Sequence, residues 1–134
     1  MKRLFLTLLV MAMTVVAMAQ TMTLRKGGST VGEIQSDGTV RISGTTVGKI
    51  ESNGDIRVGG SIEGRIEKNG DIRKRGSIVG RIEPNNDVRI NGSIVGRVEK
   101  NGDIRLNGSI IGRAEQMTDV RQVAVMYFFG FFKL

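Results

Sequence analysis

Apolar or small residues alternate with charged residues along most of the chain, as they do from Ser61 to Glu67 in the sequence SIEGRIE. A period of two is the pattern of a β-strand with one buried and one solvent-facing side. Glycines and Asn-Gly pairs recur every few residues, and each of them would lower the stability of a helix. The pattern therefore predicts short strands and excludes helices in this region.

The predicted strands belong to a repeat of 16 residues that contains no insertions. A typical copy, from Gly92 to Leu106, reads GSIVGRVEKNGDIRL. Full units begin at Gly28, Gly44, Gly60, Gly76, Gly92 and Gly108. The residues 22–27 match the second half of a unit that precedes the first full copy. We predict one β-hairpin repeat domain over residues 20–122.

The residues between the strands indicate how the strands are joined. A three-residue loop of Lys, Asn and Gly, with the glycine in a left-handed conformation, would pair Ile66 with Ile72 on one face. The same reasoning at the unit boundary predicts a three-residue loop from Leu106 to Gly108 that pairs Ile104 with Ile110. On the charged face, the first register places like charges opposite each other, so we expect these side chains to splay toward solvent and toward diagonal partners.

One repeat is too poor in apolar residues to fold alone. We expect each unit to bury about three aliphatic side chains, for example Ile62, Ile66 and Ile72, at roughly 1.5 to 3 kcal/mol each. Ordering the backbone costs about 1 to 2 kcal/mol for every residue of the unit. The repeats must therefore share a core, either in a line or in a ring.

Glycines in the middle of strands, such as Gly64, Gly80 and Gly96, distinguish these two arrangements. A glycine at such a position usually marks a bulge, a bend or the close approach of another backbone. A bend in every unit would curl the sheet, and closure would protect its edges. We predict an all-β fold of tandem β-hairpin repeats in a closed or curled radial arrangement. A linear β-solenoid and a single-layer β-meander are the alternatives.

The chain resembles the five-fold β-flower proteins, a bacterial family without a characterised function, in three features. These are the tandem GS[TI][VIE]G motifs, an exported leader in residues 1–19 and a phenylalanine-rich ending in residues 123–134. The resemblance covers essentially the whole chain after the leader. It implies a ring of hairpin petals around a central axis and brings no established activity. This chain has six unit openings and a half unit, so the ring number is left open between five and six.

Residues 1–19 have the features of a secretory signal peptide. Lys2 and Arg3 form a basic start, an apolar stretch runs from Leu4 to Val16, and Ala-Met-Ala precedes Gln20. The apolar stretch is shorter than the roughly 20 residues that cross a bilayer as a helix. We expect the protein to be exported to the periplasm, the cell surface or the extracellular space.

The C-terminal tail, residues 123–134, is the part that departs from the repeat. It holds five of the six aromatic residues of the chain: Tyr127, Phe128, Phe129, Phe131 and Phe132. The tail is predicted either to form a strand that caps or plugs the repeat core, or to dock to an envelope protein, a membrane surface or a glycan. If the tail is the functional contact surface, deleting residues 127–134 should leave a folded protein that loses envelope association.

The composition points away from catalysis. The chain has no histidine, cysteine or tryptophan, so the usual general base, transition-metal ligand and thiolate nucleophile are absent from the sequence. Carboxylate pairs such as Glu67 and Asp71 recur in other units, which is typical of a surface rather than of one active site. We expect no enzyme activity, no cofactor and no metal site.

The distribution of charged residues argues against a nucleic acid as the partner. The net charge of +7 falls to +5 without Lys2 and Arg3, and acidic and basic residues are mixed throughout. We expect no nucleic-acid binding, because that function needs a clustered basic surface. The predicted function is a non-enzymatic structural or binding module of the bacterial envelope, and the alternative is a lectin-like ring that binds several ligands.

Overall fold

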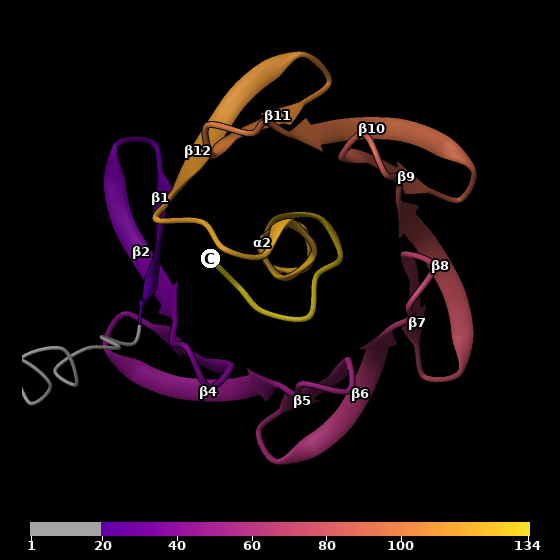
Figure 1. Cartoon of the computed structure of the whole chain (residues 1–134). Helices are drawn as coiled ribbons and strands as arrows, with labels where there is room; N and C mark the ends of the chain where they lie inside the picture. Colours follow the sequence, from indigo (N-terminus) through magenta and orange to yellow (C-terminus); the bar gives the residue numbers. More distant parts are fainter. Residues whose placement is uncertain (1–19) are drawn as a thin grey trace, which may run out of the picture.

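The computed structural model describes residues 20–134, in which twelve strands close into one sheet around a single helix (Figure 1). The strands are β1 (Met22–Lys26), β2 (Ser29–Ile34), β3 (Thr39–Ile42), β4 (Thr45–Ile50), β5 (Asp55–Val58), β6 (Ser61–Ile66), β7 (Asp71–Lys74), β8 (Ser77–Ile82), β9 (Asp87–Ile90), β10 (Ser93–Val98), β11 (Asp103–Leu106) and β12 (Ser109–Glu115). Each strand is antiparallel to its neighbours in sequence, and β1 pairs with β12. The predicted closed repeat arrangement is confirmed. The predicted signal peptide lies outside the described residues.

Six hairpins with two-residue turns project from the ring formed by residues 20–134, and we call them petals. The petals are β1–β2, β3–β4, β5–β6, β7–β8, β9–β10 and β11–β12. The half unit supplies β1, which pairs on one side with β2 and on the other with β12, so it closes the circle. The ring number that the sequence left open is therefore six rather than five.

The loops between petals have the predicted form. In the hairpin from β6 to β7, Ile66 is opposite Ile72, as the three-residue loop requires. The Glu67 N–H donates to the Asp71 carbonyl at 2.8 Å, and the Gly70 N–H donates to the Glu67 carbonyl at 3.0 Å. Gly70 has φ of 99°, which is the left-handed conformation expected at the end of this loop.

The petal turns differ from the prediction, which was wrong at the unit boundary. Asn107 and Gly108 form a two-residue turn with φ of 49° and 87°, the values of a type I′ turn. Ile110 therefore does not pair with Ile104. A β-bulge adds the extra residue Ile111, and this shift brings Gly112 opposite Ile104. The bulge restores the inward face, which a two-residue turn alone would have reversed.

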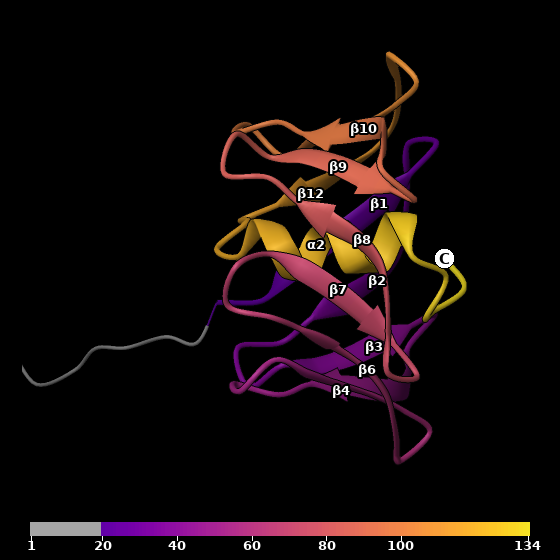
Figure 2. The same ribbon diagram turned by 90° about the vertical axis from the view of Figure 1, so that its right-hand side faces the viewer.

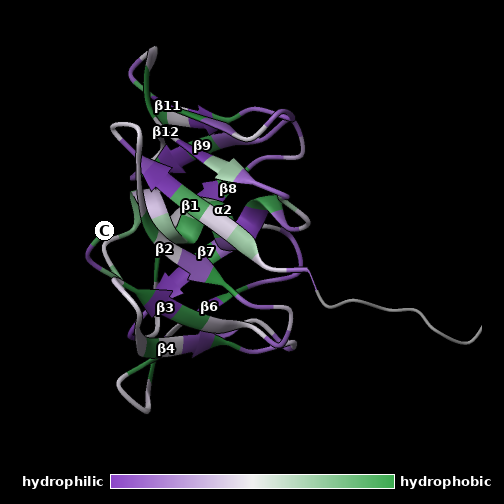
Figure 3. Ribbon diagram, turned by 90° about the vertical axis from the view of Figure 1, so that its left-hand side faces the viewer, coloured by the Kyte–Doolittle hydropathy of each residue, from purple (hydrophilic) through white to green (hydrophobic). Residues whose placement is uncertain are grey.

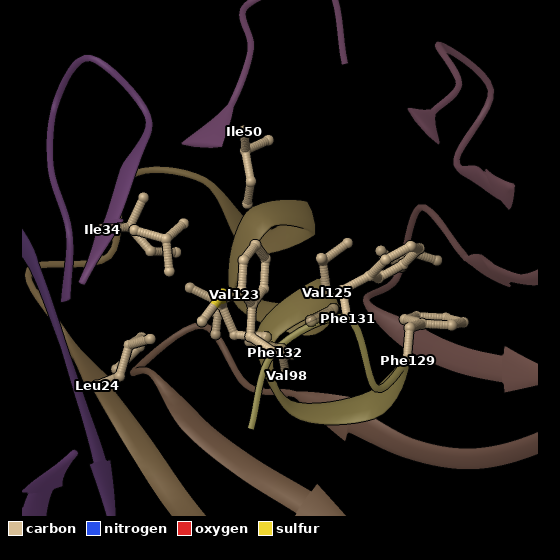
Figure 4. Packing of buried hydrophobic residues seen from close by; sticks show 14 of the residues in the cluster. Leu24, Ile34, Ile50, Val98, Val123, Val125, Phe129, Phe131 and Phe132 are labelled. Atoms are coloured by element: carbon tan, nitrogen blue, oxygen red, sulfur yellow. The ribbon is translucent and has the colours of Figure 1, made fainter. Parts of the chain in front are cut away.

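This register also corrects the predicted core. Ile72 is fully buried and Ile66 is partly buried, but Ile62 lies on the outer side of its petal and is 51% exposed. The ring interior is instead lined by aliphatic side chains such as Leu24, Ile34 and Ile50, which point toward the helix (Figure 4). Figure 3 shows hydrophobic and hydrophilic residues mixed along the strands, as this two-sided pattern requires.

Backbone hydrogen bonds join neighbouring parts of the repeat at both ends of the ring. At the petal end, the N–H of Arg75 donates to the carbonyl of the bulge residue Glu63 at 3.0 Å. At the loop end, the N–H of Ile82 donates to the Gly70 carbonyl at 2.9 Å. The first bond joins neighbouring petals and the second joins neighbouring units, so the repeats satisfy one another's backbone groups, as expected for repeats that do not fold alone.

The tail does not form the predicted strand. Val120–Phe128 form helix α2, which runs along the ring axis from the loop end to the petal end (Figure 2). Asp119 caps the helix, and its carboxylate accepts a hydrogen bond from the Gln122 N–H at 3.1 Å. The sheet of residues 20–134 is closed, so it offers no free edge to a further strand. A helix satisfies its own backbone groups, and this makes it suitable for the enclosed centre.

Candidate functional site

The aromatic residues of the tail all lie inside the ring. Phe129, Phe131 and Phe132 are 6 to 7% exposed, whereas Tyr127 and Phe128 are partly buried against the same core. Figure 4 shows Phe129, Phe131 and Phe132 just beyond the helix, in the chain that turns back along the inner wall. The structure thus places the predicted contact residues in the position of a plug, although a helix and an extended segment form it instead of a strand.

Each aromatic ring of the tail lies against one mid-strand glycine of the ring. The pairs are Gly112 with Tyr127, Gly96 with Phe128, Gly80 with Phe129, Gly64 with Phe131 and Gly48 with Phe132. A Cβ atom on any of these glycines would come within 2.5 to 2.9 Å of a Cε1 atom of its aromatic partner. We call these positions glycine seats. At Gly64, Gly80 and Gly96 the backbone of the neighbouring strand does approach closely, which is one of the three features that such glycines indicate, and the tail adds a second close contact at each of them.

Polar contacts fix the tail at both ends. At the petal end, the Tyr127 hydroxyl donates to the Arg25 carbonyl at 2.7 Å, and burial raises the pKa of Tyr127 to about 12. Lys74 donates to the Phe129 carbonyl at 3.3 Å. At the loop end, Arg121 donates to the Lys68 carbonyl at 2.9 Å. These bonds hold a non-repeating segment in one orientation within a repeating ring.

The outer wall is covered by a lattice of ion pairs. Within one loop hairpin, Arg73 Nε lies 2.7 Å from a Glu67 carboxylate oxygen, and the same diagonal pair recurs as Arg89 with Glu83 at 2.9 Å. These diagonal partners are the ones that the register predicted. Each exposed pair contributes about 0 to 1 kcal/mol, so the lattice mainly keeps the wall polar.

Four exposed isoleucines interrupt this polar surface. Ile62, Ile78, Ile94 and Ile110 are 51 to 54% exposed and lie at the same position of four consecutive petals. We call them the isoleucine arc. The corresponding residues of the first two petals are Thr30 and Thr46. Ile62 was predicted to be a core residue. It faces outward because of the two-residue turn and the bulge that follows it.

Three further properties of the described residues bear on function, namely clusters of metal-binding side chains, hollows and the length of the helix. In residues 20–134 there is no group of three or more Asp, Glu, His or Cys side chains that could hold a metal ion. A hollow of about 860 Å³ lies at the loop end and is lined by polar side chains such as Thr23, Asn101 and Glu115. Within the described part of the chain, no helix has the length and hydrophobicity needed to cross a membrane.

Comparison with known proteins gives one family. A model of the family described as "Bactofilin: Polymer-forming cytoskeletal" matches residues 45–118, which are more than half of the chain and run from β4 past the end of β12. The match supports a repeat β-fold but does not support the five-fold β-flower family. No curated protein and no solved structure matches the chain.

Proposed function

The chain belongs to the bactofilin family, and from this membership we propose that it is a structural, non-enzymatic protein that assembles with further copies of itself. The family description names polymer formation and a cytoskeletal role. The isoleucine arc is the observation that carries the proposal to particular residues, because all four side chains lie inside the matched segment 45–118.

The closed ring restricts how copies can associate. The strands of residues 20–134 have no unpaired edge, so another chain cannot extend this sheet by backbone hydrogen bonds. Association must then use side chains on the outer surface. The isoleucines are the large apolar side chains that are most exposed there, and burying them between petals of two copies would remove apolar area from water.

Sugar binding gains no support from the surface of the ring. Every aromatic residue in the described part of the chain belongs to the tail and lies inside the ring. The petals therefore offer no aromatic platform of the kind that usually binds sugars. The repeated carboxylates are paired with arginines on the outer wall, which favours a structural role over acid-base catalysis.

We also propose that the protein acts outside the cytoplasm, and the sequence of residues 1–19 is the basis for this. Expression of the full chain in a bacterial host, followed by fractionation and mass spectrometry, tests the proposal. We expect a product in the envelope or medium that begins at Gln20. An unprocessed chain in the cytoplasm would contradict it.

The test of self-association uses residues that the chain itself offers as replacements. Changing all four residues of the isoleucine arc to threonine copies the first two petals, so the fold should be kept. Sedimentation velocity over a range of concentrations should show assembly of the unaltered protein and a monomer for the fourfold variant, with equal melting temperatures.

A reciprocal variant supplies the matched control. Thr30→Ile with Thr46→Ile extends the arc to all six petals of the described ring and should increase assembly at a given concentration. If the unaltered protein stays monomeric at every concentration, the proposal is wrong. If it assembles equally well with threonines at the four positions, the arc is not the contact surface.

A further inference from the structure

The tail has five aromatic side chains, whereas the described ring has six mid-strand glycines. Five seats are each covered by one aromatic ring, in the order in which the petals follow around the circle. The remaining mid-strand glycine is Gly32, in petal β1–β2. The side-chain atom nearest to a Cβ at Gly32 would be Cγ1 of Ile42, at 3.5 Å, rather than an aromatic carbon.

A pocket of about 340 Å³ opens in this interval of the ring. Tyr127 and Phe132, the first and last aromatic residues of the tail, form part of its wall, together with Ile111 and Leu134. These two aromatic residues lie on the seats that flank Gly32, so the pocket opens in the gap between them, and Lys26 at the end of β1 is the residue that the Gly32 petal contributes to its wall. Its volume is in the lower range for pockets that bind small molecules.

Two lysines give the pocket a positive charge. Lys26 and Lys133 both line it, both are exposed, and neither forms an ion pair with another of the residues 20–134. Lys74 occupies the same position of its petal as Lys26, and its Nζ atom lies 5.1 Å from the centroid of the Phe131 ring. A lysine at this position can therefore reach over an aromatic ring that lies on a glycine seat.

We propose that this pocket binds a small aromatic acid, that is, one planar ring carrying a carboxylate. The ring takes the place of the missing sixth aromatic side chain between Tyr127 and Phe132. The carboxylate accepts charge-assisted hydrogen bonds from Lys26 and Lys133. The isoleucine arc has no part in this site, so the proposal does not depend on self-association.

Phenylacetate is a suitable probe, and calorimetric titration of the whole chain should show saturable binding of one molecule per chain. Cyclohexylacetate, which has the charge without the aromatic ring, and benzyl alcohol, which has the ring without the charge, should each bind on the order of tenfold more weakly. Amide signals of Ile111 and Leu134 should shift during the titration.

Variants distinguish this pocket from a nonspecific surface. Lys26→Gln with Lys133→Gln should weaken phenylacetate binding by about tenfold. The control Lys100→Gln, at the hollow on the loop end, should leave it unchanged. Leu134→Phe should fill the pocket and abolish binding, and circular dichroism should confirm that each variant is folded. Absence of saturable binding at millimolar phenylacetate, equal binding of the three probes, or binding unaffected by the lysine or Leu134→Phe changes would overturn the proposal.

Discussion

The tail packs against the inner wall of the ring, but the ring has a repetitive sequence and the tail does not. The ring is built from one repeated unit, and each of its loops and petals resembles the next. The tail has no repeat, yet it places a different aromatic residue on each of five petals. The repeat therefore creates equivalent mid-strand glycines around the axis. The tail makes them different, because it places an aromatic ring on every one except Gly32.

The geometry of the two parts explains why the helix ends where it does. Six petals divide the circle into steps of about 60°, whereas consecutive residues of a helix are about 100° apart. Phe128 and Phe129 lie on adjacent petals, as do Phe131 and Phe132. Tyr127 and Phe128 make one such step within α2. From Phe128 to Phe132, however, the seats advance by three petals, about 180°, whereas four helical residues would turn by about 400°, so the chain leaves α2 after Phe128 and continues along the inner wall.

Removal of the tail is the strongest way to break this relation. A chain that lacks residues 127–134 loses all five aromatic side chains from the core, and each buried aromatic contributes about 3 to 5 kcal/mol. The three that are buried, Phe129, Phe131 and Phe132, together contribute about 9 to 15 kcal/mol, which is as large as the usual stability of a domain, about 5 to 15 kcal/mol, so we expect no cooperative unfolding transition in urea. Lys133→Ser, which keeps all five rings, should unfold like the unaltered protein. A truncated chain that still unfolds cooperatively would show that the ring does not need the tail.

A single methyl group at a glycine seat should separate crowding from backbone conformation. In Gly80→Ala the new Cβ would meet the Phe129 ring at 2.6 Å and the Arg89 carbonyl oxygen even more closely, so we expect a cost of about 3 kcal/mol. In Gly92→Ala no atom lies within 4 Å, and only the left-handed φ of 84° is unfavourable, at about 1 kcal/mol. Urea unfolding measures both values. Equal costs would contradict the close packing of the neighbouring strand and the Phe129 ring at Gly80.

Alkaline pH tests the polar end of the tail through Tyr127. Its folded-state pKa of about 12 lies above the ordinary value of 10.0, so the buried phenol stabilises the fold below pH 10. This contribution should decline as the pH rises from 10 through 12, because the unfolded chain then ionises first. Tyr127→Phe removes the hydrogen bond to Arg25, which should cost about 1 kcal/mol at pH 7. The stability difference between the two proteins should shrink above pH 10, and a constant difference would contradict the assignment.

The smallest expected change in stability comes from a loop residue of the ring, Asn86. Asn86 has φ of 76° at a loop position where other units have a glycine, for example Gly70. Asn86→Gly should therefore stabilise the protein by a few tenths to about 1 kcal/mol, because glycine adopts this conformation without steric strain. Thermal unfolding would reveal a higher melting temperature. A lower one would show that the asparagine side chain contributes more than the backbone strain costs.

The same contrast explains how far the sequence predicted the structure. Repetition made the ring predictable, since Ile66 opposite Ile72 follows from one loop and applies to every unit. The petal turn was missed because Asn107-Gly108 alone would reverse the strand faces. The bulge at Ile111 corrects this, and the glycine that follows it, Gly112, is the kind of mid-strand glycine that can mark a bulge but does not distinguish it from a bend or a close approach. The outward position of Ile62 was not predicted either, because it depends on the same turn and bulge.

The tail could be predicted only in part. Its aromatic density indicated burial or contact, but the aromatic residues carry no period from which a helix followed by an inner-wall segment could be predicted. Its conformation depends on the closed sheet around it, which leaves no edge for a strand in residues 20–134. A signal was nevertheless present: five aromatic residues follow a domain with regularly spaced mid-strand glycines.

Nuclear Overhauser contacts between glycine Hα protons and aromatic ring protons test the matched seats most directly. We expect a separate aromatic partner for each of five glycines, from Gly112 with Tyr127 to Gly48 with Phe132. Gly32 should give its strongest side-chain contacts to Ile42 instead. Aromatic contacts that are missing from the five glycines, or that are the same at all six, would contradict this expectation.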